Sequence, residues 1–193
     1  FAFETAAVEL AEAAQTCGET GAAWIDSRMW ERFPSIRYLA PQTRPVEVAT
    51  LPGVDAGGVC LFTTAGEAPL PVVAHWPSPV RLMVASGGLD QTEGTPAPYP
   101  LYNIFHFAPL LPFEPIATFV NGPRLLLADV AARPDGLGVH LVWAAEEPLP
   151  AGLHIFIHWR AGDQMLAQWD GPLGGELLPA EVWRVGDQVE QSL

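Results

Sequence analysis

Three histidines in the C-terminal half of the chain are the residues best suited to bind a metal ion. His154 and His158 are four residues apart, a spacing that on a helix would present two imidazoles to one ion. Apolar and polar residues alternate around them, however, which predicts a strand on which the two rings share a face at some distance from each other. With His140 on a neighbouring strand a three-histidine site could form, but the simpler interpretation places all three on an outer sheet face. We therefore predict a fold without metal or cofactor.

Ser86 is the candidate nucleophile of a hydrolase. It lies in the run 84–88, which lacks the glycine that precedes the serine by two positions in a nucleophile elbow. His75 or His106 together with Asp90 would have to complete a triad through the geometry of loops. A turn at residues 86–88 explains this sequence without catalysis, so we assign no catalytic residue.

Two further patterns resemble functional motifs and are rejected on their context. Gly136 and Gly138 resemble the start of a dinucleotide-binding fingerprint, but they precede a predicted strand and Leu141 stands where the third glycine belongs. Glu146 and Glu147 could pose as a catalytic carboxylate pair. Because adjacent side chains point apart, we expect both to be solvated in a loop.

Four of the seven tryptophans fall in the C-terminal half, and flat aromatic rings are a common means of covering the apolar face of a sugar. Trp143 and Trp159 share their strand faces with aliphatic residues, which favours the core for both. Trp169 and Trp183 are expected to be more open. Asp170 could accept hydrogen bonds from sugar hydroxyls, so Trp169, Asp170 and Trp183 are the candidate carbohydrate-binding residues.

The charge balance excludes two classes of partner. The chain has a net charge of −13, and its nine basic residues are all arginines scattered along the sequence. Nucleic-acid binding needs clustered cations, and docking to an anionic membrane surface needs a polybasic patch. No apolar run reaches the roughly 18 residues of a membrane-spanning helix. The start at Phe1, without an initiator Met or a signal-peptide pattern, indicates a fragment of a longer protein.

The two cysteines leave two alternatives open. Cys17 and Cys60 could form one disulfide in an oxidising compartment, or they could be two small buried apolar side chains.

The N-terminal half is expected to form a small α/β layer. Residues 3–15 place apolar side chains on one helical face, and residues 22–25 form a short buried strand. Asp26 and Ser27 are favourable N-cap residues for a second helix. Further strands are expected at residues 46–51, 59–63, 71–76, 80–85 and 101–107, with a long surface loop at 86–100.

The C-terminal half alternates with a period of two, which predicts strands. On the strand 154–159 we expect Ile155, Ile157 and Trp159 to face the core and the two histidines to be exposed. Residues 161–164 form a tight turn of a hairpin. The fold class is thus α+β, a small α/β domain (1–112) followed by an antiparallel, jelly-roll-like β-sandwich domain (113–193).

Several runs together resemble one family of membrane enzymes. In order along the chain they are residues 24–30, 33–39, 138–143, 153–158, 168–172 and 183–187. They are similar to the soluble C-terminal region of bacterial dolichyl-phosphate-mannose-protein mannosyltransferase-like proteins, of the glycosyltransferase 39 type. None of these runs is a reaction signature, and together they cover 36 of the 193 residues.

The resemblance implies a soluble domain on the extracytoplasmic face of the cell membrane, attached to the membrane-spanning part of the same polypeptide. The parent enzyme would take sugar from a polyprenyl-phosphate carrier, with its catalytic acids outside this chain. The chain itself would be a non-catalytic accessory domain, with a glycan or an acceptor protein as a further partner. Two alternatives stay open: a glycan or cell-envelope binding module without enzymatic context, and a free-standing hydrolase.

Overall fold

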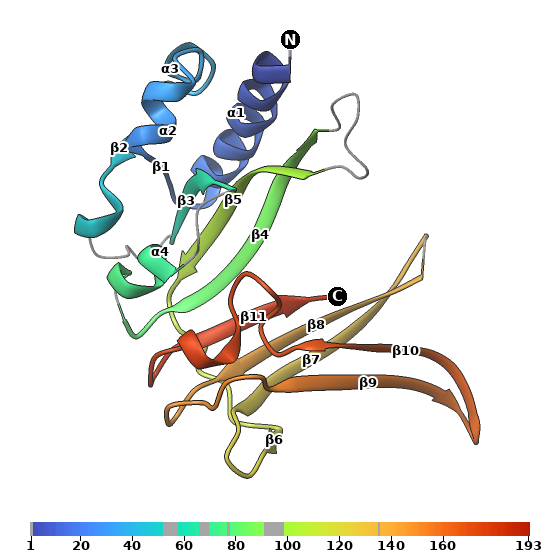
Figure 1. Cartoon of the computed structure of the whole chain (residues 1–193). Helices are drawn as coiled ribbons and strands as arrows, with labels where there is room; N and C mark the ends of the chain where they lie inside the picture. Colours follow the sequence, from blue (N-terminus) through green and yellow to red (C-terminus); the bar gives the residue numbers. More distant parts are fainter. Residues whose placement is uncertain (1, 52–57, 66–69, 77, 91–98, 135) are drawn as a thin grey trace. The chain divides into compact units, whose positions relative to one another are not determined.

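The computed structural model describes residues 2–51, 58–65, 70–76, 78–90, 99–134 and 136–193 (Figure 1). The chain forms two compact units, Phe1–Leu111 and Pro112–Leu193, here called the first and second unit. The domain division expected from the sequence lies one residue further along. The described fold is mixed α/β and consists mostly of strands.

The first unit begins with helix α1 (Ala2–Thr20), which lies against one face of a mixed sheet (Figure 1). Its apolar face buries Ala7, Leu10 and Ala14, each at most 1% exposed. This confirms the helical spacing noted in the sequence. Strand β1 (Ala22–Asp26) follows, then helix α2 (Ser27–Arg32) and the short helix α3 (Ile36–Leu39).

The sheet of the first unit has the strand order β2-β1-β3-β5-β4. Its other strands are β2 (Arg44–Val46), β3 (Val59–Thr64), β4 (Arg81–Asp90) and β5 (Tyr99–Ala108). Strand β1 runs parallel to both β2 and β3, and β5 is antiparallel to β3 and β4. Apolar side chains cover both sheet faces, with Ile25 and Phe62 in the cluster under α1 and Phe107 beside Trp76 on the other side.

Three local expectations for this unit were wrong. Residues 71–76 are not a strand, since helix α4 spans Leu70–His75; a short apolar run does not distinguish the two by periodicity. The expected strand 46–51 is the end of β2 followed by a 3-10 turn, η1 (Val48–Thr50). The expected loop 86–100 begins as strand, because Tyr102 on β5 lies across Gly87 on β4 and fills the space of a side chain there. Residues 91–98 lie outside the described part.

The second unit is almost entirely strand. Its sheet has the order β11-β8-β7-β6, with antiparallel neighbours. These strands are β6 (Ala117–Thr118), β7 (Arg124–Arg133), β8 (Gly136–Ala144) and β11 (Gln188–Ser192). A separate hairpin pairs β9 (His154–Ala161) with β10 (Gln164–Pro172), and a 3-10 turn, η2 (Ala180–Val182), precedes β11 (Figure 1).

The face alternation expected on β9 holds only for its first half. Ile155 and Ile157 are partly buried, while His154, Phe156 and His158 are exposed. Trp159 is 42% exposed and is therefore not a core residue. Alternation in the sequence predicts which side chains lie on the same face of a strand. It does not predict how much of that face is covered by other residues.

Candidate functional site

Trp183, expected to be an open sugar platform, is a core residue. Its side chain is only 4% exposed, and its indole Nε1 donates a hydrogen bond to the Leu178 carbonyl at 2.8 Å. The indole also packs against Gly174, where a Cβ atom would clash with it. The expectation that Trp183 is accessible to a ligand is therefore wrong.

Trp169 and Asp170 do lie on the hairpin, but on opposite faces of β10, because successive strand residues alternate. The Trp169 ring extends over Gly171, in the space that a side chain at that glycine would fill. Asp170 is paired across the hairpin with Phe156, on the other face. The three candidate carbohydrate-binding residues therefore do not form one site, and binding of sugar by any of them stays a prediction.

Trp159 is a further exposed aromatic residue of the hairpin, with 42% of its side chain exposed. Trp169 is paired with Ile157 and Trp159 with Ala167, so both lie on one face of the hairpin. The Trp169 ring, however, extends toward Gly171 and away from Trp159. The sequence pattern missed the exposure of Trp159 because it assigned this residue to the core.

The three histidines expected as weak metal candidates do not converge. Among the described residues, the one group whose possible ligand atoms all lie within 4.8 Å of one another is Cys17, Cys60 and His106. His154 and His158 are exposed on β9, and His140 on β8 belongs to a separate network. The three-histidine site is therefore not formed.

His140 instead connects two side chains of β11. Its Nδ1 lies 3.3 Å from Ser192 Oγ and its Nε2 lies 3.4 Å from the Glu190 carboxylate. A serine, a histidine and a carboxylate in this order resemble a hydrolase triad. However, the amides of Val139 and Leu193 beside the serine are bonded to each other's carbonyls in strand pairing, so neither can stabilise an oxyanion. This network is best explained as cross-strand stabilisation.

Ser86 has no histidine partner in the structure. Its hydroxyl donates to the Asn103 side-chain oxygen at 3.1 Å across the β4–β5 pair. His106 lies three residues from Asn103 along β5, which places it on the opposite sheet face, beside Cys60. Of the other proposed members, His75 ends helix α4 and the side chain of Asp90 lies outside the described part. The triad built on Ser86 is not formed with His106.

The rejected glycine and glutamate patterns have structural roles where they are described. Gly136 and Gly138 begin strand β8, and the Arg133 side chain occupies the space over Gly138. Glu146 forms an ion pair with Arg124, and Glu147 is exposed in a loop.

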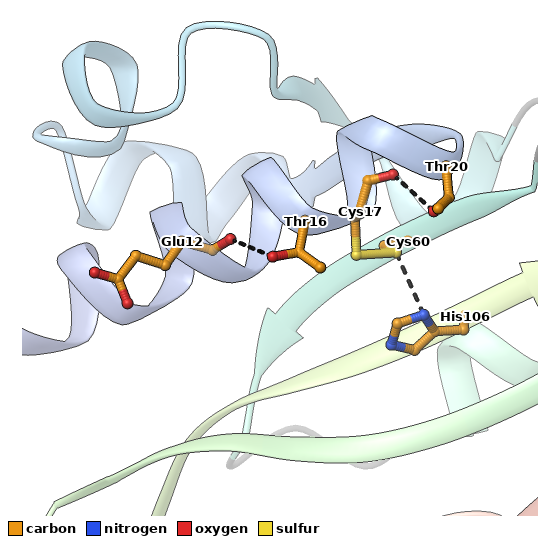
Figure 2. The surroundings of a disulfide bond; sticks show 6 residues. All are labelled: Glu12, Thr16, Cys17, Thr20, Cys60 and His106. Carbon is orange, nitrogen blue, oxygen red and sulfur yellow. Dashed lines mark hydrogen bonds between the residues drawn. A yellow bond between two sulfur atoms is a disulfide. The ribbon is translucent and has the colours of Figure 1, made fainter.

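Cys17 and Cys60 form a disulfide that links helix α1 to strand β3, with a Cα–Cα distance of 6.1 Å (Figure 2). Both cysteines are 6% exposed. Figure 2 shows the imidazole of His106 beside this bond, with Nδ1 3.4 Å from Cys60 Sγ. While the bond is intact, neither sulfur is a thiolate, so this group is not a metal site in its oxidised form.

A row of polar side chains crosses the face of the first unit's sheet that is opposite to helix α1. The row lies near the carboxyl ends of the parallel strands β1 and β3. Thr63 is paired with Asn103, and Asn103 is paired with Ser86. Asp26 follows Ile25, which pairs with Phe62, and therefore lies next to Thr63. Ligands of open α/β sheets commonly bind at this edge. The sequence indicated the row only through Thr63 and Asn103, two polar residues within apolar strands.

Most polar side chains of this row have hydrogen-bond partners within the first unit. The Asp26 carboxylate, 4% exposed, accepts from the Arg28 backbone amide at 2.8 Å and from the Arg28 guanidinium at 3.0 and 3.1 Å. It therefore caps α2, as the sequence indicated. Within the described part of the chain, the buried Asn103 Nδ2 has no hydrogen-bond partner. The row has donors, acceptors and one carboxylate, but it has no nucleophile paired with a base.

The second unit contains an apolar groove of about 440 Å³. Leu141 and Trp143 of β8 line it from the sheet, and Ile155 and Ile157 line it from the hairpin. The turn at residues 119–122 also contributes to its lining. Trp143 is 4% exposed, which confirms its expected place in the core, and its ring lies 5.9 Å from that of Phe119.

Comparison with protein-family models, with curated proteins and with solved structures found no match to this chain. Among the helices that the structure describes, none has the length and apolar character needed to cross a membrane.

Proposed function

We propose that this chain is an accessory domain on the extracytoplasmic side of a membrane glycosyltransferase that uses a polyprenyl-phosphate-linked sugar, similar to the mannosyltransferase-like enzymes. The observation that carries the proposal is the Cys17–Cys60 disulfide. Disulfides persist in oxidising compartments and are rare in the cytosol. The location thus inferred agrees with the one that the sequence resemblance implies.

The fold assigned by this proposal is an α/β layer followed by a jelly-roll-like β-sandwich. Support for the sandwich comes from the groove of the second unit, which is lined from the sheet by Leu141 and Trp143 and from the hairpin by Ile155 and Ile157. Apolar residues of two antiparallel layers that face one another are typical of a sandwich core.

The proposed role is not catalytic. The candidate nucleophile Ser86 donates its hydroxyl hydrogen bond to Asn103, and the amides of Val139 and Leu193 beside the Ser192–His140–Glu190 network are occupied by strand pairing. The membrane-spanning part of the same polypeptide is the proposed main partner, and the chain would support that part or orient its acceptor.

A binding module for glycans or another cell-envelope component is the second candidate, and the exposed indole of Trp159 on the hairpin favours it. One exposed indole offers a flat apolar surface to a sugar ring. With a single aromatic platform, affinity should be about millimolar, near −4 kcal/mol.

Two measurements separate these candidates. Titration with mannose-containing oligosaccharides, followed by tryptophan fluorescence, should give saturable quenching that is lost in Trp159→Ala or Trp169→Ala if the binding module is correct, whereas Trp183→Phe should keep it. An impermeant maleimide applied to intact cells that express the complete polypeptide tests the location. Because Cys17 and Cys60 are buried, the reporter is the variant Tyr38→Cys, at a side chain that is 87% exposed, and it should be labelled in intact cells without reductant. Labelling of Tyr38→Cys only after cell lysis would contradict an extracytoplasmic domain.

A further inference from the structure

The groove of the second unit has a lining that selects against polar ligands. Its polar side chains are Asn121 and His154, and no carboxylate or arginine lines it. A sugar or a peptide backbone would lose its hydrogen bonds to water in such a groove without replacing them. A volume of about 440 Å³ lies within the range of small-molecule sites.

The mouth of the groove is a turn that keeps apolar side chains in solvent. Val120 is 93% exposed and Phe119 is 49% exposed. The Gly122 amide closes the turn by donating to the Phe119 carbonyl, and Asn121 takes a left-handed conformation with φ of +52°. Phe156 on the hairpin, which also contributes to the groove lining, is 68% exposed. The apolar surface therefore continues from the groove to its rim.

One buried polar atom beside the groove lacks a partner. Trp143 lines the groove, and its buried indole Nε1 has no hydrogen-bond acceptor among the residues that the structure describes. A buried tryptophan N–H usually has an acceptor, and leaving it without one is unfavourable. Phe119, the half-exposed ring next to Trp143, is the side chain that a ligand would displace to bring an acceptor oxygen to this atom.

From these observations we propose that the groove binds the aliphatic chain of a neutral, single-chain amphiphile, whose head-group oxygen lies near Trp143, Asn121 and His154. The chain matches the apolar lining. The head group is inferred to be neutral because the groove lining has no Asp, Glu or Arg that could pair with a charged head group. The net charge of −13 also disfavours an anionic head group. This inference does not depend on the proposed enzymatic context.

The test is a titration of the whole chain with hexanol, octanol, decanol and dodecanol, followed by calorimetry. Each added methylene should tighten the dissociation constant about fourfold until the groove is filled, after which the gain should stop. Decanol brominated on the carbon next to its hydroxyl-bearing carbon should quench tryptophan fluorescence, and Trp143→Phe should reduce this quenching. Decanoate should bind at least about tenfold more weakly than decanol, because its charge has no partner in the groove.

A matched pair of variants locates the binding. Ile155→Phe fills the groove from the hairpin and should weaken decanol binding at least tenfold. Leu166→Phe, on the same hairpin but outside the groove lining, should leave it unchanged. If circular dichroism shows that Ile155→Phe is misfolded, Leu153→Phe replaces it.

Three results would overturn the proposal: no saturable binding of any alcohol, affinity independent of chain length, or equal affinity in Ile155→Phe and the parent. Sedimentation with phosphatidylcholine vesicles tests whether the protein binds a bilayer instead of a single amphiphile. Vesicle binding without alcohol binding would mean that the exposed turn inserts into a bilayer and that the groove is not a ligand site.

Discussion

Removal of the Cys17–Cys60 disulfide should destabilise the first unit by an amount set by the length of chain that it closes. The two cysteines are 43 residues apart in the sequence. The loop-closure entropy of the unfolded chain for this separation corresponds to about 4 kcal/mol at 25 °C. For a unit of this size that loss is about 15 °C in Tm.

The assay is thermal unfolding of the whole chain by circular dichroism, with and without a phosphine reductant. We expect the reductant to lower the transition of the first unit by about 15 °C in the parent and to have no effect on the double variant Cys17→Ala/Cys60→Ala. The variant should unfold near the temperature of the reduced parent. A thiol titration of the denatured, unreduced chain should find no free thiols. A reductant effect below about 1 kcal/mol would refute the loop-closure argument, and two free thiols would refute the bond itself.

Three further predictions concern the backbone, a helix cap and a buried phenol. Gly174→Ala should cost several kcal/mol in urea unfolding, because φ is +82° and a Cβ would meet the Leu178 carbonyl and the Trp183 ring; Gly175→Ala, at φ +80° with open space, should cost only about 1 kcal/mol. Asp26→Ala should lose about 1–2 kcal/mol, whereas Arg28→Ala, with a 64% exposed side chain, should lose much less. Burial, and then the charges of Glu9 and Glu12, raise the pKa of Tyr102 above 10.0. The folded state therefore holds this proton more tightly than the unfolded state, and the resulting stability is present below pH 10.0 and lost as pH rises through the folded pKa. Tyr102→Phe should show a smaller alkaline loss of stability in urea titrations repeated across that range.

Local sequence patterns were sufficient for elements fixed by local physics. The N-cap at Asp26 is made with the amide two residues later, and the turn of the β9–β10 hairpin is placed by Gly162 at φ +59°. The helix around residues 3–15 follows from its apolar spacing. In each case the deciding interaction lies within a few residues of the pattern.

Features that depend on distant segments were missed. Gly87 is expected from the sequence in a turn, but it is a strand residue that pairs with Tyr102 on β5, whose ring fills the space of a side chain there. Trp183 follows a loop without periodicity, and its burial depends on the Leu178 carbonyl and on Gly174. The disulfide could not be inferred from two cysteines alone, since their proximity results from the packing of α1 against β3.

Transfer of sugar by the membrane polypeptide that we propose as the parent of this chain tests the central claim most directly. That proposed polypeptide would be reconstituted in vesicles with a polyprenyl-phosphate-linked sugar and an acceptor, both intact and with residues 1–193 excised. We expect the excised form to transfer more slowly than the intact form, and the isolated chain to give no turnover of the donor. Equal rates in both forms would contradict the accessory role, and turnover by the isolated chain would contradict its being non-catalytic.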